Sequence, residues 1–150
     1  MPEPETTVLA ELKVPARDEF IGVAKRVASS LGVQLGFGLD EIDELAIAVV
    51  QACSGSIESA EQMWGPGATL KLTYESTGSG IAVEVDALAP TSQEALPLPR
   101  PQPVRRAAAQ KHLQQAVEEA MIRLLVDDLR RQVDAGRRQI RYRMVKYLVS

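Results

Sequence analysis

Two periods of hydrophobic residues divide the chain into elements. Apolar side chains recur at every second position in four segments, which predicts half-buried β-strands over 7–14, 68–75, 81–85 and 139–149. In three other segments they recur every three or four positions, which predicts amphipathic helices over 18–31, 40–60 and 104–135. The glycine-containing segment 76–80 joins two of the strands into a hairpin.

The apolar faces of the three predicted helices differ. The first ends before a loop marked by Gly32, Gly36 and Gly38, and its stripe consists of Phe20, Val23, Ala24, Val27, Ala28 and Leu31. The second begins at Asp40, because Asp40 and Asp43 resemble a capping box. Its wide face of small residues should lie flat on a sheet and comprises Ile42, Leu45, Ala46, Val49, Ala52, Cys53, Ser56, Ile57 and Ala60. The third ends before Gly136, and its apolar pattern runs through Leu113, Val117, Ala120, Met121, Leu124, Leu125 and Leu129.

This order of elements predicts one α+β domain over residues 1–150. The amphipathic helices must cover one face of a mixed, mostly antiparallel sheet, which gives a two-layer α/β sandwich. In the last strand, Ile140, Tyr142 and Met144 face one way. The segment 87–103 contains five prolines and little periodicity, so we expect a long extended loop there.

Composition narrows the function classes further. Hydrophobic residues make up 45% and charged residues 25% of the 150, which is ordinary for a soluble globular protein. A single cysteine, Cys53, excludes an internal disulfide, and we expect it to be a buried core residue. A single histidine, His112, argues against a histidine-based zinc or catalytic centre. The sequence has no apolar run near 20 residues and begins with an acidic, proline-interrupted segment, so we expect a cytoplasmic protein.

Charge is distributed unevenly along the chain. Residues 1–99 contain 5 Lys/Arg and 15 Asp/Glu, whereas residues 100–150 contain 12 Lys/Arg and 5 Asp/Glu. A basic third can indicate nucleic-acid binding, here through Arg130, Arg131, Arg137, Arg138, Arg141 and Arg143. Tyr142 is the only aromatic residue interleaved with these arginines, which is too few for a series of stacked bases. We therefore expect them to line the solvated face of the long helix and an outer strand, with Asp127 and Asp128 ion-paired on that helix.

Four local sequences resemble the anti-sigma factor serine kinases of the GHKL superfamily, the histidine-kinase-like ATPases. They are Leu12–Ala16, Asp40–Leu45, Ile47–Ala60 and Lys146–Leu148. The resemblance is strong over 9–85, loose over 104–150 and absent over 87–103. It implies the histidine-kinase-like ATPase fold, with the proline-rich loop in place of the family's ATP lid. By composition alone, this loop also resembles an SH3-domain ligand.

In that family the second helix reads Ile-Ala-Val-x-Glu-Ala-x-x-Asn-Ala. The resemblance implies that the glutamate is the general base for a serine hydroxyl and that the asparagine helps to hold Mg²⁺ against ATP. The matching positions in this chain are Gln51 and Gly55. Glutamine cannot take up a proton near neutral pH, and glycine offers no side-chain ligand.

The family's two other nucleotide motifs also differ in this chain. An aspartate at the end of the second hairpin strand reads adenine in the family, but strand parity places Ala87 there and turns Asp86 to the other face unless a bulge restores it. The family's phosphate-binding Gly-x-Gly-Leu turn falls near 115–122, which contains no glycine. Arg105 and Arg106 could contact phosphate by charge alone.

We therefore predict an anti-sigma-factor-like regulatory protein that binds a protein partner and uses no cofactor. The resemblance implies a sigma factor or a STAS-type antagonist as partner, and a homodimer, both through residues 8–31. Our candidate contacts are Arg17, Phe20, Lys25 and Arg26. Trp64 is a further contact or packs against the hairpin. The alternative is an ATP- and Mg-dependent serine-protein kinase in which Gln51 orients the hydroxyl and Asp86 reads adenine.

Overall fold

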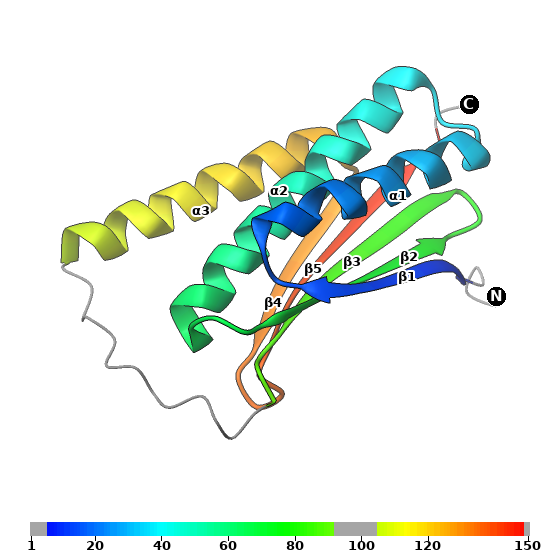
Figure 1. Ribbon diagram of the computed structural model, residues 1–150. Helices are drawn as coiled ribbons and strands as arrows, with labels where there is room; N and C mark the ends of the chain where they lie inside the picture. Colours follow the sequence, from blue (N-terminus) through cyan, green and yellow to red (C-terminus); the bar gives the residue numbers. More distant parts are fainter. Residues whose placement is uncertain (1–5, 92–104, 149–150) are drawn as a thin grey trace.

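The computed structural model describes residues 6–91 and 105–148, without the side chains of residues 105–109 and 111. Its elements are β1 (Thr7–Pro15), a short 3₁₀ helix η1 (Asp18–Phe20), α1 (Ile21–Leu35), α2 (Leu39–Trp64), β2 (Thr69–Ser76), β3 (Gly80–Leu88), α3 (Arg105–Leu125), β4 (Asp128–Asp134) and β5 (Gln139–Tyr147). The five strands form one sheet in the order β1-β2-β3-β5-β4, and each pairing is antiparallel. All three α-helices cover the same face, with α2 between α1 and α3 (Figure 1). The predicted α+β sandwich is confirmed.

The core lies between α2 and the three central strands. All nine residues predicted for the apolar face of α2 are buried. Beneath them the strands contribute alternate residues, as the period of two requires: Leu70, Leu72 and Tyr74 from β2, Val83, Val85 and Ala87 from β3, and Ile140, Tyr142 and Met144 from β5. Cys53 is fully buried, and this burial raises the pKa of its thiol to about 12. Trp64 is the last residue of α2 and packs partly against this core.

Helix α1 is longer than the sequence pattern predicted. Gly32 lies inside the helix, because its missing side chain lets Ile42 of α2 approach; a Cβ there would lie 3.1 Å from Ile42 Cγ1. The helix ends at Gly36, which has the left-handed φ of 90° that glycine tolerates. Val23 is exposed and does not belong to the predicted stripe. The predicted end of this helix before Gly32 is therefore wrong, because Gly32 marks a close contact with α2 rather than the end of α1.

The start of α2 also differs from the prediction. Gly38 is the N-cap residue, and the Glu41 carboxylate accepts a hydrogen bond from the Gly38 backbone N–H at 3.2 Å. Asp40 and Glu41 both lie in the first turn, where the helix dipole favours acidic side chains. The acidic residues do mark the start of the helix, as predicted, but the helix begins at Leu39 rather than at Asp40.

The predicted helix over 104–135 is wrong in its last third. Helix α3 ends at Leu125, and residues 128–134 form the edge strand β4 against β5. Leu129 satisfies both patterns, because it lies four residues after Leu125 and also alternates with Arg131 and Val133. Asp127 and Asp128 therefore do not form an ion-paired helix face. Asp127 Oδ2 instead accepts the Tyr147 backbone N–H at 2.7 Å.

The apolar pattern of α3 does not face the core as predicted. Ile122 is the buried residue of its inner side, with Leu125 half-buried beside it. Five residues of the predicted pattern are instead exposed, namely Leu113, Val117, Ala120, Met121 and Leu124. His112 is exposed, as we expected.

The C-terminal ends of α3 and β5 are fastened to α2 through one buried cation. Lys146 Nζ donates at 2.8 Å both to Glu44 Oε2 of α2 and to the last backbone carbonyl of α3, at Leu125. A lysine at this carbonyl also complements the negative end of the helix dipole. The strand β3 continues to Leu88, so the predicted loop begins later than residue 87, and its residues 92–103 lie outside the described part of the chain. No described helix combines the length and the apolar content needed to cross a bilayer.

Candidate functional site

The side of α2 that faces α3 contains the two positions that the resemblance singles out. Gln51 is half-buried and Gly55 is fully covered. Residues four apart on a helix lie one above the other, so both positions face the same neighbours. Helix α3 packs along this side, as Figure 1 shows, while β5 passes underneath.

Side chains from two other elements occupy the space beside Gly55. A Cβ atom at Gly55 would lie 3.0 Å from Glu118 Oε2 of α3 and 3.1 Å from the Tyr142 hydroxyl of β5. Both distances are tighter than ordinary van der Waals contact. Tyr142 and Glu118 therefore lie in the space that the first atoms of a side chain at position 55 would enter.

A polar network holds Tyr142 in this place. Its ring is 1% exposed, and its hydroxyl accepts a hydrogen bond from Arg131 Nε of β4 at 3.1 Å. The Arg131 guanidinium lies 5.6 Å from the centre of the Tyr142 ring and 3.6 Å from Glu119 of α3. One arginine on the edge strand therefore joins β5 and α3 beneath the α2–α3 contact.

The charges beside Gly55 are unfavourable for phosphates. Burial raises the pKa of Glu118, and the neighbouring Glu58 carboxylate raises it further. Burial likewise raises the pKa of the Tyr142 hydroxyl, although Arg131 opposes this shift. Two acids, Glu118 and Glu58, thus lie close together here, and the cation that contacts Tyr142, Arg131, is already paired with Glu119. Among the described residues no cluster of three or more Asp, Glu, His or Cys side chains could hold a metal ion.

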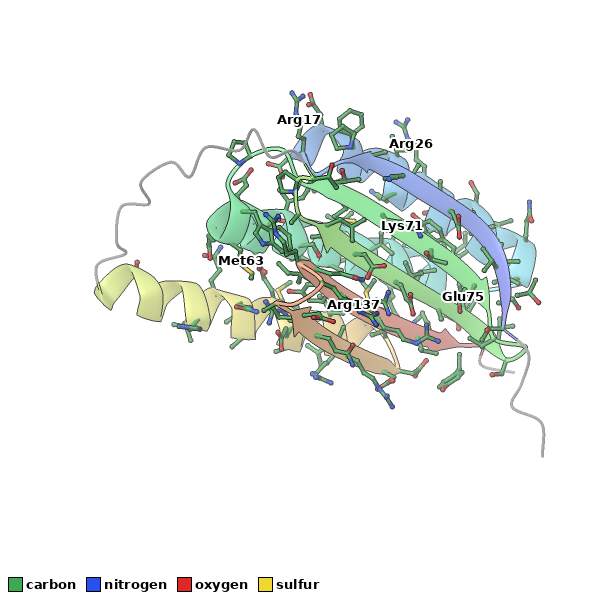
Figure 2. All side chains as sticks on the ribbon, turned by 90° about the horizontal axis from the view of Figure 1, so that it is seen from below. Arg17, Arg26, Met63, Lys71, Glu75 and Arg137 are labelled. Carbon is green, nitrogen blue, oxygen red and sulfur yellow. The ribbon has the colours of Figure 1, made fainter. Side chains whose placement is uncertain are left out.

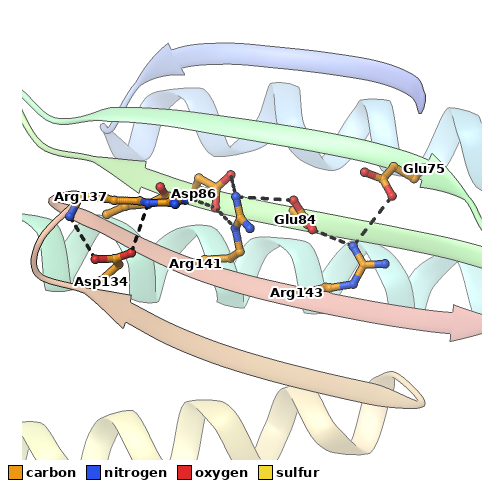
Figure 3. Close-up of polar contacts among 8 residues, drawn as sticks. Glu75, Glu84, Asp86, Asp134, Arg137, Arg141 and Arg143 are labelled. Carbon is orange, nitrogen blue, oxygen red and sulfur yellow. Dashed lines mark hydrogen bonds and ion pairs between the residues drawn. The ribbon is translucent and has the colours of Figure 1, made fainter. Parts of the chain in front are cut away.

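Asp86 lies on the other face of the sheet from Ala87, as strand parity predicts. Ala87 is buried in the core under the helices, whereas Asp86 belongs to a row of ion pairs on the face without helices (Figure 3). Arg141 Nε donates to Asp86 Oδ1 at 2.7 Å, and Gln139 donates to the same oxygen at 3.0 Å. No register shift interrupts the β2–β3 pairing, so no bulge turns Asp86 toward α2.

This row of ion pairs continues along the open face. Arg143 Nη1 lies 2.7 Å from Glu84 and 3.8 Å from Glu75, and Glu84 also lies 3.9 Å from Arg141. Lys71 and Glu75 project from β2 on this same face (Figure 2). Opposite charges on neighbouring strands stabilise the exposed surface of an antiparallel sheet.

The arginines of the basic third are mostly paired within the described structure. They lie on β4, β5 and the turn between them rather than on the long helix. Of the six considered for nucleic-acid binding, five contact acids: Arg130 with Asp128, Arg131 with Glu119, Arg137 with Asp134, Arg141 with Asp86, and Arg143 with Glu84. Ion pairing of this extent leaves little positive charge for phosphates, which argues against the nucleic-acid hypothesis. The side chains of Arg105 and Arg106 lie outside the described residues.

A groove of about 790 Å³ opens on the opposite side of α2. Ile57, Ala60 and Glu61 line it from the helix, and residues 13–17 and 65–69 complete its walls. Ile57 follows Gly55 by two residues, or about 200° around the helix, so the groove and the filled site are on different sides. Val14, Ala16, Ala60 and Ala68 make its lining largely apolar, with Lys13, Arg17 and Glu61 among the charged residues.

Of the predicted partner contacts, Arg17 lines this groove. Arg17 is exposed and forms an ion pair with Glu19 at 2.6 Å, and Phe20 is half-buried beside it in η1. Lys25 and Arg26 are exposed on the first turns of α1. Figure 2 shows Arg17 and Arg26 along the same edge of the molecule, next to β1.

This chain is similar to serine-protein kinases named RsbW. It is 35% identical to the one from Halalkalibacterium halodurans over 72 residues, or 48% of this chain and 41% of the relative. It is 36% identical to that of Bacillus pumilus over 56 residues, and 38% identical to that of Bacillus subtilis over 50 residues. The chain thus spans 31–41% of the length of these relatives. No protein-family model matches it.

Sequence reasoning identified Gln51 and Gly55 but missed the residues that surround them. Tyr142, Glu118 and Arg131 lie far along the chain, and no local motif connects them to α2. The one available signal was Gly55 itself, because a glycine inside a long helix often marks a close approach by another group.

Proposed function

We propose that this protein is an anti-sigma-factor-like regulator that acts by binding a protein partner, without binding ATP or transferring a phosphoryl group. The observation that carries the proposal is the packing at Gly55. There, Tyr142 and Glu118 occupy the space that the first atoms of a magnesium-binding side chain at position 55 would enter. Gln51 adds to this argument, because an amide cannot accept the proton of a serine hydroxyl.

The similarity to proteins named serine-protein kinases supports the ancestry, and the groove beside Arg17 supports the binding role. We propose a sigma factor or a STAS-type antagonist as the partner, in the cytoplasm. The partner would contact β1, η1 and the first turns of α1 through Arg17, Phe20, Lys25 and Arg26. The same region would form a homodimer. In protein–protein interfaces, anchor side chains of one partner commonly fill pockets on the other.

A thermal unfolding experiment with Mg-ATP tests the first half of the proposal. We expect an unchanged Tm at millimolar nucleotide, with the serine-protein kinase RsbW of Bacillus subtilis as the positive control. A ligand at 100 times its Kd stabilises a protein by about 2.7 kcal/mol. A rise in Tm of that size would favour the variant kinase with ATP and Mg as cofactors.

Native mass spectrometry tests the second half. The full chain would be mixed in turn with each sigma factor and each STAS-type protein encoded by the same genome. We expect a complex with at least one of them in the absence of nucleotide. If none of them forms a complex, the proposed partner class is wrong.

A further inference from the structure

Helix α3 has an apolar stripe on its outer side, away from the sheet. Leu124 is 86% exposed, Leu113 67% and Val117 51%, and Ala120 between them is exposed as well. The opposite side of the helix faces inward through Ile122, Glu118 and Glu119. Single exposed apolar residues are ordinary on a surface, but a continuous row on one helix indicates contact with another molecule.

The spacing of the stripe specifies what kind of surface fits it. Leu113, Val117, Ala120 and Leu124 are separated by four, three and four residues, which is the a/d spacing of a helix-to-helix seam. Figure 1 shows α3 at the outer edge of the helical layer, where no other described element lies over this side. A second helix therefore matches the stripe in shape.

We propose that this stripe pairs with the same stripe of a second copy of the chain, with the two α3 helices antiparallel. In that arrangement Leu113 meets Leu124 of the second copy, and Val117 meets Ala120 of the second copy. Each small residue is thus opposite a larger one, which fills the seam evenly. A parallel arrangement would instead place Ala120 against itself and leave a gap.

Charge is compatible with this self-pairing. Among residues 113–124, the only cation is Arg123, and the acids Glu118 and Glu119 face inward. Antiparallel pairing places Arg123 beside the uncharged Ala116 of the second copy, so no like charges meet there. The dipoles of two antiparallel helices also oppose each other favourably.

The length of the stripe sets the strength of the contact. Twelve residues of helix span about 18 Å at 1.5 Å per residue. A seam of that length buries less than the ~1,200 Å² at the lower limit of stable interfaces. The self-association is therefore weak and depends on concentration. It is independent of the proposed function and uses a surface remote from residues 8–31.

Sedimentation velocity of the full chain, from low micromolar to submillimolar concentration, tests the proposal. We expect the mass to rise with concentration, and the variant Leu124→Glu to weaken this association about tenfold or more. The matched control is Val33→Glu, which introduces the same charge at an exposed residue of α1 and should have no effect. If a dimer through residues 8–31 also forms, Leu124→Glu removes only the step above that dimer. A concentration-independent mass for the wild type, or equal behaviour of both variants, would overturn the proposal.

Cysteine cross-linking tests the direction of pairing. Cys53 is fully buried, so introduced cysteines are the accessible thiols among the described residues. A mixture of the Leu113→Cys and Leu124→Cys variants should form a disulfide-linked heterodimer under mild oxidation. Each variant alone should not, because identical positions lie about 16 Å apart in the antiparallel seam, beyond disulfide reach. Efficient cross-linking of each single variant with itself would contradict the antiparallel arrangement.

Discussion

The two sides of helix α2 have opposite character. The side toward α3 is filled beside Gly55 by Tyr142 and Glu118. The side toward β1 leaves an open groove of about 790 Å³ beside Arg17. Both sides belong to one continuous helix of 26 residues that spans the sheet. This groove is therefore on the side of the predicted partner contacts.

This difference is what the proposed loss of a nucleotide site, with the surrounding framework retained, requires of α2. The small residues of α2 that allow close packing on the sheet are needed for folding whatever the ligand. Gly55 is different, because the Tyr142 hydroxyl lies in the space that a side chain at position 55 would need. The following variants test whether substitutions on the two sides differ in their effects on folding stability and on partner binding.

The largest effect is expected for Tyr142→Ala, which removes the side chain that fills the first side. Loss of a buried aromatic ring should lower the free energy of unfolding by about 3–5 kcal/mol, measured by urea titration. The control Tyr142→Phe keeps the ring and removes the hydroxyl that accepts from Arg131, at a cost of about 1 kcal/mol. A loss for Tyr142→Ala no greater than for Tyr142→Phe would mean that the ring does not fill this side.

Gly55→Asn introduces the residue that the resemblance places at this position. It should destabilise the protein by about 1–3 kcal/mol, because its Cβ meets Glu118 and Tyr142. The matched control is Gly22→Asn in α1, where no heavy atom lies within 4 Å of an added Cβ. We expect the control to unfold at the same or a higher urea concentration than the wild type. Equal stability of the two variants would show that the site beside Gly55 is not filled.

Arg17→Glu tests the open side. Reversing this charge should weaken partner binding about tenfold, or 1.4 kcal/mol, in isothermal titration calorimetry. Its exposed ion pair with Glu19 contributes little, so the stability should change by less than about 1 kcal/mol. Arg130→Glu, an equally exposed reversal on the far edge strand, is the control and should bind normally. If both variants lose the same affinity for the partner, Arg17 does not contact the partner specifically, and the loss is a general effect of charge.

The smallest effect concerns pH. The raised pKa of Glu118 means that the folded state binds its proton more tightly than the unfolded state does. This contribution to stability is present below the ordinary glutamate pKa of 4.5 and is lost as pH rises through the folded-state value. Glu118→Gln should therefore gain stability relative to the wild type between pH 4 and pH 7. A constant difference across this range would contradict the raised pKa.

The sequence predicted the helices and strands correctly where the spacing of apolar residues matches the side of the element that faces the core. Strands β1, β2, β3 and β5 and the whole apolar face of α2 follow from spacing alone, because in each of them apolar residues recur on the side that faces the core. The pattern failed where one residue fits two periods, as Leu129 does between α3 and β4. It also failed on α3, whose outer stripe has the spacing of a core-facing one.

The candidate site could be only half predicted. Gln51 and Gly55 were recognisable because they stand in a local motif on one helix. Gly55 and Tyr142 are 87 residues apart in the sequence. Neither local sequence indicates that the two residues are in contact. The groove was equally hidden, because it depends on how the end of α2 meets the end of β1.

The position of β5 in the sheet has a consequence for synthesis. This strand follows all the others along the chain, yet it lies between β3 and β4. While residues 139–147 are still inside the ribosome, β3 has one unpaired edge and apolar residues on both faces, among them Ile81, Ala82 and Val83. Such an edge readily pairs with other chains. A stalled nascent chain that ends before residue 139 should therefore need a chaperone, although the finished protein folds without leaving this edge open.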